Sequence, residues 1–422
     1  MGKHRRINSN KNNDRNSENS FERTPKNSLT VWSVFVIGFI IIILSVSSAV
    51  FPALLISIVG DGEFLDPFEM SSTGPSIITI NLIIIGLIVI HNRKLLPESV
   101  TNTIQRIFSF ELSRKNSLVL LIIILAVYIS ISMNELTLNE LNQYGDYLIL
   151  EDALRIWPDG KTDNLYVTEQ ITRHVRMALL SLSNEVFDNI KVIPFLASIF
   201  LLIITYFLTI KFSKKNFIGL IAVVLVIQSS TFFTYDSIAV YENFWALFYV
   251  VSIYLIFQKP KISSISFLLS IFSKAITILM LPTTIIVTIL SDINNKKKIF
   301  VIITNIIAVV ISIIIFQLSG SIYSNVIDIN PSEFLTGFTT LAFNLRFDVV
   351  LLLFLLPTSI GLFIKAKNGS RNAISLMVLM CGTILVTPFL EMITNFYFVY
   401  PYRYVPLVIF FAISLASLFS KK

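Results

Sequence analysis

Eleven long apolar stretches limit what this chain can fold into. They lie near residues 31–58, 75–91, 118–133, 192–210, 217–233, 240–257, 263–290, 299–318, 347–364, 374–393 and 403–419. Most of them approach the ~20 consecutive apolar residues that span a bilayer as a helix. Charged residues make up 14% of the chain, whereas soluble proteins carry roughly 25%. These features predict an all-α, polytopic helix bundle in a membrane, and they exclude a soluble globular enzyme.

The net charge and the single cysteine narrow the functional classes. The formal net charge is +7, and in a membrane protein such an excess is typical of cytoplasmic loops, so no nucleic-acid partner is expected. Cys381 lies inside an apolar stretch, which excludes an intramolecular disulfide and a thiolate metal site. The sequence contains no phosphate-binding glycine-rich loop, zinc-ligand spacing or Ser-His-Asp pattern. We therefore expect neither a metal nor a cofactor.

Basic segments predict on which side of the membrane each loop lies, because Lys and Arg remain on the cytoplasmic side. Residues 1–29 are polar and basic, and we expect them to form a disordered cytoplasmic tail. Residues 60–74 contain four acids and neither Lys nor Arg, so they are expected outside. Residues 92–117 contain five Lys and Arg residues and are expected inside.

The stretch 263–290 decides the orientation of everything that follows it. As one span it would place the lysines at 296–298 outside, whereas a hairpin of two short helices keeps these and the later basic clusters inside. Lys274 and Pro282 lie near its middle, where they offer a polar apex and a break in the helix. We therefore predict about 12 helical passes in the cell membrane, with both termini cytoplasmic.

The chain divides into three parts. After the tail, residues 30–116 are expected to form two additional transmembrane helices and a cytoplasmic linker, and residues 117–422 the main transmembrane domain. Its largest polar segment is the external loop 134–190. Apolar residues recur there at helical spacing in two sets, Leu150, Ala153 and Leu154, then Ile171, Val175, Leu179 and Leu182. Helices of this kind are expected to lie at the membrane surface.

Four motifs follow one another in the main domain. They are Gly145-Asp146 before Glu151-Asp152-Ala153-Leu154, the run from Ser229 to Asp236 with Tyr241-Glu242-Asn243-Phe244, Phe272-Ser273-Lys274 before Leu281-Pro282, and Tyr402-Arg403-Tyr404. In this order they resemble the GT-C superfamily of membrane glycosyltransferases, which includes protein O-mannosyltransferases and bacterial aminoarabinose transferases. The resemblance covers roughly residues 118–422 and implies a GT-C-like fold there.

The resemblance also implies a reaction, namely transfer of a sugar from a polyprenyl-phosphate donor to a glycan, lipid or protein acceptor at the external face. The donor already carries a phosphate leaving group. Inversion at the sugar therefore needs a base for the acceptor hydroxyl and cations for the phosphate, with no obligatory metal. Asp146 is the expected catalytic base. The expected supporting acids are Glu151, Asp152, Asp236 and Glu242, and the expected donor-phosphate ligands are Lys274, Arg403, Arg173, His174 and Arg176.

Each of these residues also has an ordinary structural explanation. Asp146 is suited to cap a helix N-terminus, and the other loop acids to face water. Lys274 can reach the membrane surface along its own stem, and Arg403 can anchor an aromatic belt there. The cations around His174 can bind lipid head groups.

Two other classes of function remain open on the sequence. A transporter or flippase for a lipid-linked or anionic solute would carry charges deep in several helices and two related halves. Few such charges and no repeat are found, and the polar groups gather on the external side. A non-catalytic assembly subunit is the other alternative, because Tyr147 follows Asp146 where the superfamily commonly has a second acid.

Overall fold

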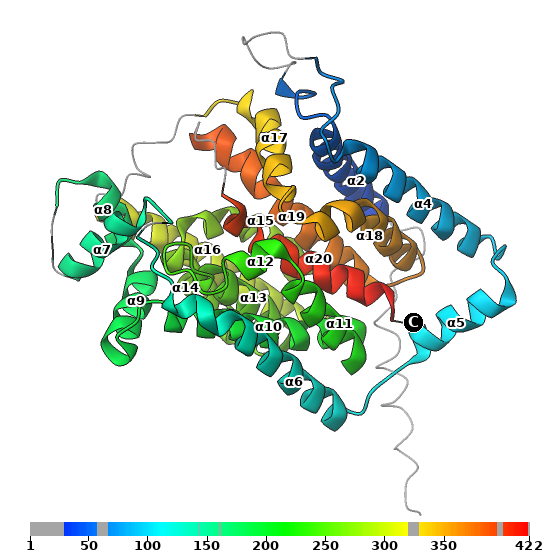
Figure 1. Cartoon of the computed structure of the whole chain (residues 1–422), viewed down its shortest axis with the longest axis horizontal. Helices are drawn as coiled ribbons and strands as arrows, with labels where there is room; N and C mark the ends of the chain where they lie inside the picture. The colour runs from blue at the N-terminus through cyan, green and yellow to red at the C-terminus, as the bar shows by residue number, and fades with distance from the viewer. Residues whose placement is uncertain are drawn as a thin grey trace, which may run out of the picture.

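The computed structural model describes residues 29–56, 66–141, 143–158, 160, 162–319, 329–394 and 400–420, and all of its regular elements are helices (Figure 1). Apart from Leu29, the predicted tail lies outside these residues. Eight helical segments of the described residues are long and apolar enough to cross a membrane, namely α2 (Leu29–Val50), α4 (Gly74–Asn92), α6 (Arg114–Ser132), α10 (Val192–Ser213), α16 (Asn295–Leu318), α18 (Val349–Lys367), α19 (Arg371–Thr394), and α20 (Val405–Leu418) together with the 3₁₀ helix η4 (Pro401–Tyr404) before it. The chain is therefore an all-helical, multi-pass membrane protein.

Shorter helices also belong to the bundle: the apolar α11 (Asn216–Ile227), α13 (Phe244–Gln258), α14 (Pro260–Ser273) and α15 (Leu281–Leu290), and α17 (Glu333–Leu345), which packs against α19 and α2. In the apolar windows of α19 and of α20, 78% of the residues are buried, against 17% in α4. Helices α19 and α20 thus form the centre of the bundle, and the apolar surface of α4 is left at its edge, where lipid solvates it. The number of bilayer crossings, 12, stays a prediction.

The chain reverses direction at Lys274. The contacts that show this are Ser264 with Thr304 at 2.5 Å between hydroxyl oxygens, Phe272 with Phe316 at 5.6 Å between rings, and Lys298 with the carbonyl of Ile289 at 2.7 Å. The first two make α14 parallel to α16, and the third makes α15 antiparallel to α16. A 3₁₀ helix, η2 (Ala275–Met280), joins the two arms. This reversal agrees with the hairpin expected from the charge pattern.

The basic segments meet at one end of the bundle. The contacts that join them are Lys215 with Phe108, Asn372 with Phe212, Arg371 with Asp292, and Lys365 with Ser417. The loop that follows α6 meets the turn before α13 at the other end, for example through Asp146 and Tyr241. Basic and acidic loops therefore lie at opposite ends of the spans, as the orientation rule requires. Which end faces the cytoplasm stays a prediction.

Cysteine labelling tests this orientation. In a Cys381→Ser background, a single cysteine at Asn164 should react with an impermeant maleimide added to intact cells, because α8 (Leu165–Thr172) begins there at the acidic end. A cysteine at Asn294, which caps α16 at the basic end, should react only after the cells are opened. External reactivity at position 294 would overturn both the hairpin and the predicted count of passes.

Candidate functional site

The loop between α6 and α10, which the sequence predicts to be external, forms its own helices and folds over the turn before α13. It contains η1 (Met133–Thr137), α7 (Tyr147–Ile156), α8 and α9 (His174–Phe187). Arg173 separates α8 from α9, so Ile171 does not share a helix with Val175, Leu179 and Leu182 as expected from their spacing. A small second core buries Leu150, Ala153, Met177 and Leu180 against Ile238, Ala239 and Tyr402. This core fixes the loop helices relative to the turn and to the start of the last span.

Two buried charged residues hold the turn from opposite sides. Glu140 accepts hydrogen bonds from the backbone N–H groups of Ala239 and Val240, at 2.8 and 3.1 Å. Arg176 Nε lies 3.0 Å from Glu242 Oε2, and its Nη2 donates to the carbonyl of Val240 at 2.9 Å. Arg176 thus bonds both to the carboxylate of Glu242 and to backbone carbonyls of the turn, so removal of either charge would leave its buried partner uncompensated.

The side chain of Lys274 lies against two aromatic rings. Its ammonium nitrogen is 3.7 Å from the centroid of the Tyr402 ring and 5.8 Å from that of the Trp245 ring. The residue is only 6% exposed, and no carboxylate among the described residues lies within the 4.0 Å of an ion pair. The guanidinium of Arg403 lies 5.7 Å from the centroid of the same Tyr402 ring. Two cations therefore share one ring, and no carboxylate in the part of the chain that the structure describes pairs with Lys274.

Asp146 connects to this cation site through stacked tyrosines. Its Oδ2 accepts a hydrogen bond from the hydroxyl of Tyr241 at 3.1 Å, and the Tyr241 ring stacks on Tyr402 at 4.5 Å. Asp146 occupies the N-cap position of α7, but its side chain does not cap the helix. Burial, together with the nearby carboxylate of Asp146, raises the pKa of Tyr241, so the phenol remains a donor. The carboxylate is thus oriented by a neighbour instead of being used as a cap.

The structure brings some of the other predicted residues to this site and leaves others outside it. Asp152 pairs with Arg155 at 2.5 Å on the exposed face of α7, and Glu151 beside it is exposed as well. Arg173 pairs with Glu169 in the break between α8 and α9. The His174 ring lies 6.3 Å from that of Phe272, two residues before Lys274, so the start of α9 borders the cation site.

Asp236 belongs to a different cluster, which ties α6 to the turn. Its Oδ2 accepts hydrogen bonds from the hydroxyls of Tyr128 and Ser132, at 2.7 and 2.8 Å, and its Oδ1 is buried without a partner among the described residues. Burial raises the pKa of this carboxyl to about 6. These contacts indicate that Asp236 fixes α6 to the turn.

The raised pKa predicts a pH-dependent stability. The folded state holds the proton of Asp236 more tightly than the unfolded chain does, so the contribution of this carboxyl to stability is greatest below its unfolded pKa of 3.8 and is lost as the pH rises to about 6. In Asp236→Asn the amide oxygen still accepts from Tyr128 and Ser132 but cannot ionise. The free energy of unfolding of Asp236→Asn relative to wild type should therefore rise between pH 4 and pH 7, by at most about 3 kcal/mol. The difference in melting temperature between the two proteins should rise with it. Thermal unfolding in detergent measures this, with the exposed Asp163→Asn as a control whose difference should not change with pH.

The sequence did not reveal Glu140, Lys191 or Tyr128. Lys191 donates to the carbonyl of Leu138 at 3.3 Å and lies 3.9 Å from Glu140. Glu140 and Tyr128 make these contacts with the turn 99 and 108 residues further along the chain, and Lys191 contacts Leu138, 53 residues before it. No periodicity within a single segment reports such a contact.

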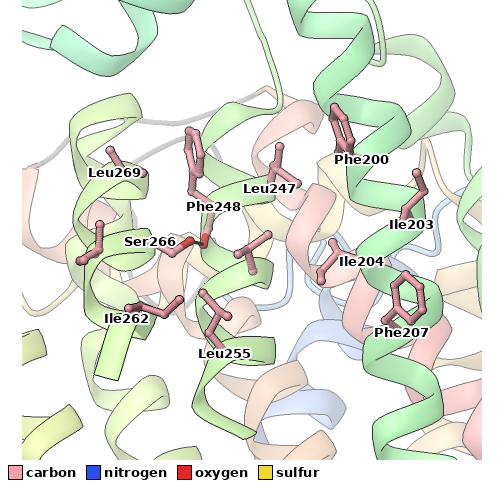
Figure 2. Close-up of a pocket in the computed structure, with 12 residues that line it drawn as sticks. Phe200, Ile203, Ile204, Phe207, Leu247, Phe248, Leu255, Ile262, Ser266 and Leu269 are labelled. Atoms are coloured by element: carbon pink, nitrogen blue, oxygen red, sulfur yellow. Dashed lines mark hydrogen bonds between the residues drawn. The ribbon is translucent and has the colours of Figure 1, made fainter. Parts of the chain in front are cut away.

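An apolar groove runs along α10, α13 and α14. Figure 2 shows its wall, with Phe200, Ile203 and Phe207 from α10, Phe248 and Leu255 from α13, and Ile262 and Leu269 from α14. Its volume is about 640 Å³, and Ser266, its one polar lining residue, donates its hydroxyl to the carbonyl of Phe248 at 2.7 Å. A second apolar groove shares Phe200, Leu247 and Phe248 with it and continues to Leu179 and Leu182 of α9. The grooves are thus continuous, and their helices also carry Arg176, Trp245 and Lys274.

Comparison with protein-family models, with curated protein sequences and with solved structures returns no match. Within the described residues, no group of three or more His, Cys, Asp or Glu side chains could hold a metal ion. The chemistry that the described side chains themselves offer is an oriented carboxylate, two neighbouring cations and a long apolar groove.

Proposed function

We propose that the protein is an inverting glycosyltransferase that moves a sugar from a polyprenyl-phosphate donor to an acceptor at the external face of the cell membrane. Asp146 takes the proton of the acceptor hydroxyl, and Lys274 and Arg403 bind the donor phosphate. The protein is then a GT-C-like enzyme with its termini in the cytoplasm.

The observation that carries this proposal is the buried cation at Lys274. An ammonium enclosed by Tyr402 and Trp245, without a carboxylate beside it, costs free energy unless an anion binds there. Arg403 on the same ring increases the local positive charge, and the start of α9 adds the positive end of a helix dipole. A phosphate is the anion that such a convergence favours.

The apolar groove supports a lipid-linked donor over a soluble one. A polyprenyl chain is a long hydrocarbon, and the two grooves together offer a continuous apolar path along α9, α10, α13 and α14. Leu269 of α14 lies at this path, five residues before Lys274, which occupies the C-cap position of that helix. A phosphate at Lys274 would leave the chain to follow the groove. A nucleotide sugar has no group that would occupy it.

Asp146 lies on the other side of the tyrosine stack from Lys274. The tyrosines Tyr241 and Tyr402 separate the proposed base from the proposed phosphate ligands. An inverting displacement needs the base and the phosphate ligands on different sides of the sugar, since the acceptor oxygen attacks the anomeric carbon on the face opposite the departing phosphate. The resemblance of the surrounding motifs to GT-C enzymes supports the same assignment of roles.

Purified protein in vesicles, supplied with radiolabelled polyprenyl-phosphate hexoses and a panel of glycan, lipid and peptide acceptors, tests the proposal. Transfer of label to an acceptor, with release of polyprenyl phosphate, is the expected result. Movement of labelled donor between leaflets without transfer would favour a flippase. Donor binding with neither transfer nor movement would favour an assembly subunit.

A further inference from the structure

Helix α5 (Glu98–Ser109) has an apolar face that the described protein does not cover. Val100, Ile104, Ile107 and Phe108 fall on one side of the helix, and Asn102, Gln105 and Arg106 on the other. None of its residues is buried, and Val100 and Ile107 are 42% and 46% exposed. Only its C-terminal end is held, where Phe108 lies against Phe419 and its carbonyl accepts from Lys215. An isolated helix of this length is marginal in water, so its face needs an apolar neighbour.

The position of α5 in the chain places it at the depth of a membrane surface. It connects the end of α4 with the start of α6, two helices apolar enough to span a bilayer, and Figure 1 shows it between them at the edge of the molecule. Helix α4 ends, and α6 begins, at the basic end of the bundle, so both ends of α5 lie there. The connection is therefore confined to the boundary between lipid and water.

The charges around α5 match an anionic surface. Its residues and immediate flanks carry five cations, Arg93, Lys94, Arg106, Arg114 and Lys115, and two acids, Glu98 and Glu111. All five cations are exposed, and none of them has a carboxylate of the described residues within 4.0 Å. Glu111 already accepts from Asn216. Basic residues beside a membrane span attract anionic lipid head groups, by about 1 kcal/mol each.

We propose that α5 is a membrane-surface helix that binds anionic lipids. Its Val100, Ile104 and Ile107 face lies between head groups and acyl chains in the leaflet at the basic end, and its flanking cations contact anionic head groups. The first span pair would thereby be tied to the rest of the bundle through lipid as well as through protein. This inference does not depend on the proposed transferase activity.

Two labelled variants of the full chain test the location. In a Cys381→Ser background, an environment-sensitive fluorophore is attached to Ile107→Cys or, as the matched control on the polar side of the same helix, to Asn102→Cys. Each protein is reconstituted in phosphatidylcholine vesicles that contain spin-labelled phosphatidylcholine or spin-labelled phosphatidylglycerol. The label at position 107 should emit at shorter wavelength and be quenched roughly threefold more strongly than the label at 102.

The spin label also tests the preference for charge. Phosphatidylglycerol should quench position 107 more than phosphatidylcholine does, and Arg93→Gln with Lys94→Gln and Arg106→Gln should remove that difference. Equal quenching at 102 and 107 would overturn the surface location, and equal quenching by the two lipids would overturn the contact with anionic head groups. A blue shift at 107 without lipid quenching would also overturn the proposal, because another protein segment or a second copy would then cover the face.

Discussion

Asp146→Asn should lower turnover in the transfer assay roughly 100-fold or more, since it removes the proposed base. Asparagine keeps the volume of the side chain and an oxygen that can accept from Tyr241, so the stack of Tyr241 on Tyr402 should survive. Unfolding temperature and yield of folded protein should therefore stay close to wild type. A loss of turnover without a loss of stability is the signature of a base.

Asp152→Asn is the matched control for this prediction. Asp152 lies on the same helix as the proposed base, but on its exposed face, where it pairs with Arg155. Exposed ion pairs contribute little to stability, so turnover and melting temperature should both remain near wild type. Equal activity in Asp146→Asn and wild type would refute the assignment of the base. Tyr241→Phe should give an intermediate loss, because the carboxylate keeps its charge but loses its orienting hydrogen bond.

Lys274→Met should lower turnover by roughly 100-fold, because negative charge grows on the departing phosphate and the cation stabilises it more in the transition state. Methionine keeps the length of the side chain and suits its apolar surroundings. Removing an enclosed ammonium relieves a desolvation cost that exceeds the cation–π attraction it loses. The melting temperature should therefore stay unchanged or rise while activity falls.

Lys261→Met is the matched control, since Lys261 lies exposed at the start of the same helix, α14. It should affect neither turnover nor stability. Arg403→Lys should impair transfer as well, because lysine cannot hold two phosphate oxygens at once. Unchanged turnover in Lys274→Met and Arg403→Lys, measured with a soluble short-chain donor, would show that the donor phosphate binds elsewhere.

The features of the fold that could be predicted from the sequence are those set by the membrane. Long apolar stretches and basic loops report directly on which segments cross the bilayer, and Lys274 inside such a stretch marked the reversal between α14 and α15. The break at Arg173 was missed, because apolar residues continue at helical spacing through it. Local periodicity cannot detect one residue with non-helical dihedrals.

Some residues of the candidate site could likewise be predicted from the sequence, and others could not. Asp146, Lys274 and Arg403 stood out because each is a charge at an unusual place in the sequence. Glu140 and Lys191 did not, since an acid and a base in a polar loop are normally solvated, and only the fold shows that they are buried. In the sequence, Tyr241 and Tyr402 are recognisable only as neighbours of the charged residues Glu242 and Arg403. Their stacking, which joins the two halves of the site, is a contact between distant segments.

The wide spacing of the site along the chain has a consequence for biosynthesis. The loop helices leave the ribosome well before the turn at Ala239–Glu242 that Glu140 and Arg176 hold, and Tyr402 is made last of all. Glu140 and Arg176 lack their partners until residues 239–242 have been made, and the surface that Tyr402 later covers stays open to chaperones and proteases until the span that begins there has been inserted. A nascent chain that stops before Tyr402 would therefore expose apolar surface that quality-control proteins recognise. The residues that form the candidate site are thus also those that cover this surface in the folded chain.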